Sequence, residues 1–75
     1  MKVYVKKTVE IRDEFIKLDD LLKFTGFVLS GGEAKALILD GQIKVDGEVC
    51  LMRGKKIYPG MKVVADNKIF EVKKA

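Results

Sequence analysis

The side chains best suited to chemistry in this chain are basic, and the densest group lies in one short segment. Arg53, Lys55 and Lys56 fall within four residues of one another. Such a cluster can neutralise the phosphates of a polyanion. The cluster also lies in the positive half of the chain, since residues 41–75 hold eight basic and four acidic side chains, whereas residues 1–40 hold seven of each. We expect a positive face that contacts a nucleic acid, although lysines that only keep a surface soluble would have the same composition.

A second candidate is the segment that begins at Ser30, where the Ser-x-x-Glu spacing is typical of a capping box at a helix N-terminus. The Ser30 hydroxyl can accept from the backbone N–H of Glu33, and the glutamate can accept from the N–H of Ser30. Gly31 and Gly32 leave the free N–H groups of the first turn open to a phosphate, and Lys35 adds charge one turn later. The Glu33 carboxylate opposes this role because it competes for the same N–H groups and repels phosphate. A simple helix cap is the alternative interpretation.

Gln42 and Lys44 form a third candidate, on a predicted strand. They alternate with Ile43 and Val45, which we expect to be buried, so Gln42 and Lys44 should point outward together. Lys44 is then placed to contact a phosphate, and an ordinary exposed lysine is the alternative.

Catalytic and metal-binding side chains are scarce. The chain has no histidine and one cysteine, Cys50. A structural zinc site needs about four Cys or His ligands, and a Cys–His nucleophile needs both partners. Cys50 lies between Val49 and Leu51, so we expect it to be a small buried hydrophobic side chain. We therefore expect no catalytic residues, no metal and no cofactor.

Apolar periodicity predicts the elements that hold these residues. The first segment, residues 3–11, alternates loosely and is rich in β-branched side chains, which predicts a strand at a sheet edge. One helix is expected from Leu18 to Gly26 and another from Ser30 to Gly41, each with one apolar stripe and a glycine at its end. The stripes are Leu18, Leu21 and Leu22 in the first helix and Ala34, Leu37 and Ile38 in the second. Residues expected in the core also include the connection 27–29 and Phe15, Phe24, Phe27 and Phe70.

After Gly41 the apolar period changes from helical to alternating. Strands are predicted over residues 42–45 and 48–51, joined by Asp46-Gly47, and over residues 61–65 and 68–72, joined by Asp66-Asn67. Pro59-Gly60 marks a further turn, and Lys73 and Lys74 are expected to form a solvated tail. The prediction is one α+β domain over residues 1–75, with two short helices packed on a small, mostly antiparallel sheet. No apolar run is long enough to cross a bilayer or to act as a signal peptide, so we expect a cytoplasmic protein.

The order of these residues resembles the S4 RNA-binding domain. The matching pieces are residues 16–22, the helix opened by Ser30, residues 43–49 and residues 58–63, so that the resemblance covers residues 14–65. The Ser-Gly-Gly-Glu-Ala-Lys segment and the small size look most like the small stand-alone S4 proteins of the YaaA/YbcJ type.

This resemblance implies the L-shaped alpha-L motif and the binding of structured RNA, either ribosomal RNA or tRNA-like. Catalysis in such relatives lies in other domains. The family often has basic residues directly after the helix-opening serine and two positions later, but Gly31 and Glu33 stand there. An arginine pair is therefore not available in this chain.

We thus expect an RNA-binding module that uses phosphate and shape contacts, because no aromatic pair suited to base stacking appears on a strand. The expected partner is ribosomal RNA or a ribosomal particle, and the expected state is a monomer that is not bound to a membrane. A small protein-interaction module, in which the edge strand pairs with a partner protein, is the alternative. The predicted RNA-binding residues are Ser30, Gly31, Gly32, Lys35, Gln42, Lys44, Arg53, Lys55 and Lys56.

Overall fold

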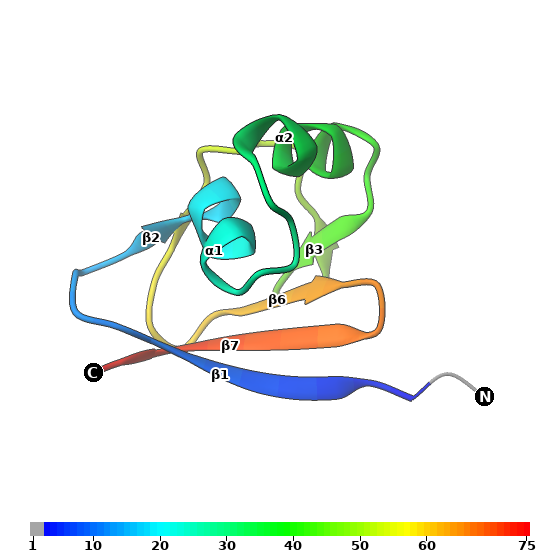
Figure 1. Ribbon diagram of the computed structural model, residues 1–75. Helices are drawn as coiled ribbons and strands as arrows, with labels where there is room; N and C mark the ends of the chain where they lie inside the picture. The colour runs from blue at the N-terminus through cyan, green and yellow to red at the C-terminus, as the bar shows by residue number, and fades with distance from the viewer. Residues whose placement is uncertain (1–2) are drawn as a thin grey trace.

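Two helices cover one face of a five-stranded sheet, and a two-stranded sheet lies beside them (Figure 1). The computed structural model describes residues 3–75. The elements are β1 (Val5–Ile11), β2 (Ile16–Lys17), α1 (Leu18–Phe24), α2 (Gly31–Leu39), β3 (Ile43–Val45), β4 (Glu48–Val49), β5 (Lys56–Ile57), β6 (Lys62–Ala65) and β7 (Lys68–Lys74). The predicted α+β class, with helices packed on a small sheet, is confirmed.

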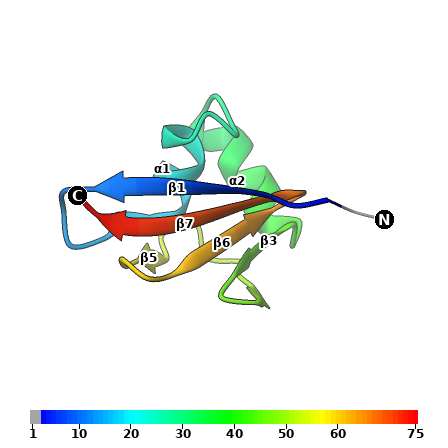
Figure 2. The same ribbon diagram turned by 90° about the horizontal axis from the view of Figure 1, so that it is seen from below.

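The main sheet has the strand order β1-β7-β6-β3-β4 (Figure 2). Only β1 and β7 pair in parallel, and the other neighbours pair antiparallel, as predicted for a mostly antiparallel sheet. β1 lies at the edge, where the sequence placed it. Val9 and Ile11, near the end of β1, are buried, whereas Val5 at its start is exposed. β1 therefore joins the core at its C-terminal half.

The two helices begin in different ways. In α2 the Ser30 hydroxyl accepts from the backbone N–H of Glu33 at 3.2 Å, which is the predicted cap. Within residues 3–75 the reciprocal bond from the N–H of Ser30 to the Glu33 carboxylate is not made, so only half of the capping box forms. In α1 no side chain caps the first turn. Instead the N–H groups of Leu18 and Asp19 donate to backbone carbonyls from a distant loop.

The predicted turns are confirmed by their backbone angles. Asp46 and Gly47 both have positive φ, +50° and +89°, as a tight turn between antiparallel strands requires. Gly60 has φ +98°, and the N–H of Met61 donates to the carbonyl of Tyr58 across the Pro-Gly turn at 3.0 Å. These turns return the chain along the sheet and fix which side chains share a face.

The core lies between the helices and the sheet. Its buried side chains come from both helices, from the connection between them and from β1, β3, β5, β6 and β7; they are Val9, Ile11, Leu18, Leu21, Leu22, Val28, Ala34, Ile38, Ile43, Val45, Ile57, Val63, Ala65, Phe70 and Val72. Both predicted helical stripes are thus confirmed, with Leu37 only partly buried. Cys50 is half-buried rather than fully buried, and its Sγ lies 3.6 Å from the carbonyl of Met52.

Two residues expected in the core are exposed. Leu29 is 90% exposed and Phe24 is 66% exposed. In the short connection between the helices Val28 is buried and Phe27 is partly buried, with the centre of its ring 6.2 Å from that of Phe70, as predicted. Leu29 faces solvent because neighbouring side chains of an extended chain point to opposite sides. Phe24 follows Leu22 by two positions, which turns it about 200° around the helix from that buried residue. Both predictions were therefore wrong for geometric reasons.

The ends of the strands also differ from the prediction. β4 stops at Val49 instead of continuing to residue 51. Lys73 and Lys74 belong to β7 and do not form a free tail. The Lys74 ammonium donates to the carbonyl oxygens of Arg12 and Asp13, at 2.9 and 3.3 Å, because the parallel pairing brings this strand end beside the end of β1.

Candidate nucleic-acid interface

The loop that holds Arg53 and Lys55 is attached to the N-terminus of α1. The carbonyl oxygen of Lys55 accepts from the N–H of Leu18 at 2.9 Å, and that of Arg53 accepts from the N–H of Asp19 at 3.0 Å. These bonds satisfy two of the free N–H groups at the start of the helix. They also hold the loop by its backbone, so the basic side chains remain exposed to solvent.

Pairing between β2 and β5 adds one lysine to this group. Ile16 lies opposite Ile57 and Lys17 lies opposite Lys56. The Lys56 ammonium lies 4.9 Å from the centre of the Phe15 ring, a cation–π contact. We call Lys17, Arg53, Lys55 and Lys56 the basic corner. Sequence reasoning missed Lys17 because a two-residue strand is too short to show a period.

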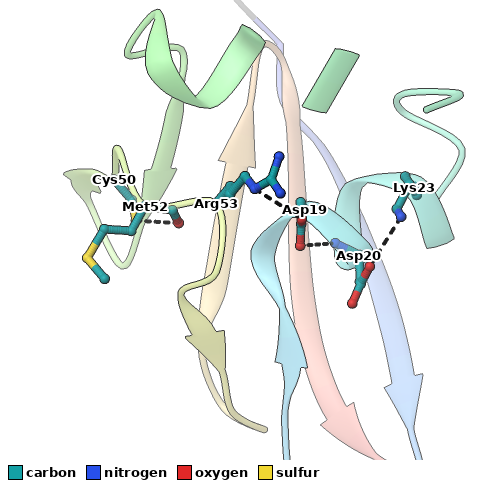
Figure 3. A network of polar contacts seen from close by, with 6 residues as sticks. All are labelled: Asp19, Asp20, Lys23, Cys50, Met52 and Arg53. Carbon is teal, nitrogen blue, oxygen red and sulfur yellow. Dashed lines mark hydrogen bonds and ion pairs between the residues drawn. The ribbon is translucent and has the colours of Figure 1, made fainter. Parts of the chain in front are cut away.

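A chain of polar contacts runs along α1 from Arg53 of the basic corner, through Asp19 and Asp20, to Lys23 (Figure 3). Arg53 Nε lies 4.0 Å from a carboxylate oxygen of Asp19, and Lys23 Nζ lies 3.3 Å from Asp20. The two carboxylates therefore offset part of the charge of Arg53 and Lys23. Within residues 3–75, Lys17, Lys55 and Lys56 make no ion pair, so their charge is available to a ligand.

Lys23 lies beside the N-terminus of α2. A Cβ atom built on Gly31 would be 4.0 Å from its Nζ. Sequence reasoning placed only Lys35 near this helix start. Lys23 lies on α1, so the residue spacing around Ser30 could not reveal it. It supplies a cation near the place where the family often has basic residues after the serine. Gly32 and Lys35 are exposed, and Gly31 is partly buried.

Gln42 and Lys44 lie on the other side of the sheet. Figure 2 looks onto the face of the sheet that no helix covers. Ile43 and Val45 are buried toward the helices, so the exposed Lys44 side chain points out from this open face. The Gln42 side-chain amide donates to the Asp40 carboxylate. The predicted outward direction of Lys44 is therefore correct. However, the structure does not bring this residue together with the basic corner and the α2 start on one face.

Residues 3–75 contain no group of three or more His, Cys, Asp or Glu side chains that could hold a metal ion. None of the helices described over the same residues is long and apolar enough to span a membrane.

Comparison with known proteins agrees with this architecture. Residues 9–73 match the family model described as "S4 domain". The chain is 46% identical over 48 residues to YbcJ of Escherichia coli (strain K12), a protein named as a candidate for RNA binding; the match covers 64% of this chain and 69% of YbcJ. A protein of Shigella flexneri, also called YbcJ and named as uncharacterized, matches with the same identity and coverage. Because the family model matches most of this chain, the protein belongs to the S4 domain family and is a small member of the YbcJ type.

Proposed function

We propose that this protein is an RNA-binding module that contacts the phosphates of a structured RNA. The proposed partner is ribosomal RNA or a ribosomal particle. The observation that carries the proposal is the basic corner. Its cationic side chains are exposed, while the loop beneath them is held by hydrogen bonds to the first turn of α1. Membership of the S4 domain family and the RNA-binding description in the name of one relative support the same function.

Rigid placement matters because phosphate contacts set the orientation of a protein on a nucleic acid. A loop already ordered in the free protein loses little conformational entropy when it binds. The α2 start, with Ser30, Gly31, Gly32 and Lys35, lies along the same helical layer and offers a second phosphate contact next to Lys23. We further propose that the protein acts in the cytoplasm as a monomer and is not an enzyme.

Crosslinking to RNA in cells, followed by sequencing of the attached RNA, tests this function. The test variant is Arg53→Glu/Lys55→Glu/Lys56→Glu. The control, Lys7→Glu/Arg12→Glu/Lys68→Glu, makes the same charge change in β1, directly after β1 and in β7. We expect ribosomal RNA to be recovered with the wild type and the control, and to be lost with the test variant. Recovery of no RNA by the wild type, or equal recovery by the test variant, would refute the proposal.

A second candidate function is strand pairing with a partner protein at the free edge of β1. The N–H of Val5 donates to Asn67, and the carbonyl of Ile11 accepts from Ala75. Because alternate residues of a strand direct their backbone groups to opposite sides, the groups of Lys6, Thr8 and Glu10 face outward from the sheet. A hollow of about 420 Å³ lies between this edge and the C-terminus of α1, lined in part by the exposed Phe24.

Replacement of Thr8 by proline separates the two candidates. The Thr8 N–H does not serve the pairing with β7, so the fold should tolerate proline at this edge position. Strand pairing with a protein partner should be lost in Thr8→Pro and should change little with salt. RNA binding through the basic corner should be unchanged in Thr8→Pro and should weaken steeply as salt rises.

A further inference from the structure

The face of the sheet opposite the helices has a hollow with a chemically mixed lining. Its volume is about 480 Å³, within the range of small-ligand sites. It is lined by Tyr4, Gln42, Lys44, Gly47, Val64, Asp66 and Ile69. We call it the open-face hollow. It combines an aromatic ring, an amide and a cation above an aliphatic floor.

The floor belongs to a single row across four strands. Lys44 of β3 pairs with Val64 of β6, Val64 pairs with Ile69 of β7, and Ile69 pairs with Lys6 of β1. Side chains paired in this way point to the same face. The row therefore reads lysine, valine, isoleucine, lysine, with two partly buried aliphatic side chains between two cations.

The charges around the floor favour an anionic ligand at the Lys44 end of the row. Lys6 forms an ion pair with Glu71 at 3.3 Å, and its hydrogen bond and charge, together with the charges of Lys73 and Lys62, lower the pKa of Glu71. Three lysines thus surround one carboxylate on this face. Among residues 3–75, Lys44 makes no ion pair, so it remains available at the other end of the row.

We propose that the open-face hollow binds one unpaired nucleobase of the RNA, with Lys44 on its phosphate. This inference rests on the proposed RNA-binding function and adds a base contact to it. A planar base suits an aliphatic floor beside the Tyr4 ring, since bases stack on aromatic side chains without strong sequence preference. The Gln42 amide donates to Asp40, and its oxygen remains able to accept from a base edge.

The hollow also faces away from the basic corner. A folded RNA held at the basic corner can therefore reach it only with a single-stranded end or loop that passes around the sheet. This separation predicts that the two sites respond differently to RNA structure. Duplex regions should engage the basic corner, and an unpaired segment should engage the open-face hollow.

Methyl NMR with two RNA probes tests the proposal. One probe is a blunt RNA hairpin, and the other is the same hairpin with a single-stranded tail. We expect the tailed hairpin alone to shift the methyl signals of Val64 and Ile69, because a stacked base exerts a ring current on them. The methyl signals of Leu39, exposed on α2, serve as the control. Tyr4→Ala and Lys44→Ala should each weaken binding of the tailed hairpin by about tenfold and leave binding of the blunt hairpin unchanged.

The possible failures are distinguishable. If the protein binds both hairpins equally and the Val64 and Ile69 signals do not move, this inference is wrong and the RNA-binding function stands. If the protein binds neither hairpin nor cellular RNA, both proposals are wrong. If an extended peptide shifts these methyl signals and neither RNA does, the hollow serves a protein partner and the base-binding proposal is overturned.

Discussion

Removal of two lysines from the basic corner should change the salt dependence of RNA binding by a definite amount. Lys55 and Lys56 are exposed and make no ion pair within residues 3–75, and Lys56 contacts only the uncharged Phe15 ring, so each can neutralise one phosphate. Each phosphate neutralised contributes about 0.7 to 0.9 to the slope of log affinity against log salt concentration. The variant Lys55→Ala/Lys56→Ala should therefore lower the magnitude of this slope by about 1.4 to 1.8.

The structure also predicts that Arg53 contributes less than either lysine. Its guanidinium lies 4.0 Å from the Asp19 carboxylate, which offsets part of its charge before any RNA arrives. Arg53→Ala should thus reduce the slope by clearly less than one lysine does. Its backbone carbonyl still accepts from the N–H of Asp19 in this variant, so the loop should keep its position.

The assay is fluorescence anisotropy of a labelled structured RNA, titrated at potassium chloride concentrations from about 50 to 300 mM, where counterion release dominates. Lys7→Ala/Lys68→Ala is the matched control, because it removes the same charge from strands away from the basic corner. An equal loss of slope in the control would mean that only net charge matters. An unchanged slope in Lys55→Ala/Lys56→Ala would refute the assignment of the basic corner.

Three further predictions concern stability. Leu29→Ser should change the free energy of unfolding in urea by less than about 0.5 kcal/mol, because the side chain is exposed. Replacement of the buried Leu22 by alanine should lower the same free energy by about 2 to 5 kcal/mol. A large loss in Leu29→Ser would contradict the exposed position of Leu29. Ser30→Ala should cost about 1 kcal/mol in thermal unfolding through loss of the helix cap, and an unchanged melting temperature would show that the cap bond contributes nothing. Because Lys6 lowers the pKa of Glu71 below its ordinary 4.5, the carboxylate stabilises the fold above that pH and loses this effect as the pH falls through the lower folded value. Melting temperatures measured below pH 4.5 should therefore fall less steeply in Glu71→Gln than in the wild type, and equal slopes would show that the ion pair has no effect.

Local signals in the sequence were sufficient for the helices and turns. The cap at Ser30, the helix end at Gly41 and the hairpin at Asp46-Gly47 all formed as predicted. Each depends on hydrogen bonds or backbone angles within a few residues, so neighbouring residue types are enough to predict it. The outward direction of Lys44 was also predictable, because the alternation of side chains along a strand is local.

The arrangement of the candidate site depended on pairings between distant segments. The partnership of β2 with β5 places Lys17 opposite Lys56, and the packing of α1 beside α2 places Lys23 near Gly31. Residue spacing predicts neither contact, because each joins two different elements and depends on how those elements pack. The parallel pairing of β1 with β7 likewise turned an expected tail into an ordered strand end.

The sequence by itself therefore determined which residues are cationic, which are apolar, and where the helices and turns lie. Only the tertiary structure decided that the predicted RNA-binding residues divide between two faces. The physical reason is that the sheet separates them: the buried Ile43 and Val45 pack toward the helices, so Lys44 must project from the opposite side, while hydrogen bonds to the first turn of α1 hold the basic corner on the helical side. The composition sets the amount of positive charge, but the pairing of the strands decides on which face of the protein that charge lies.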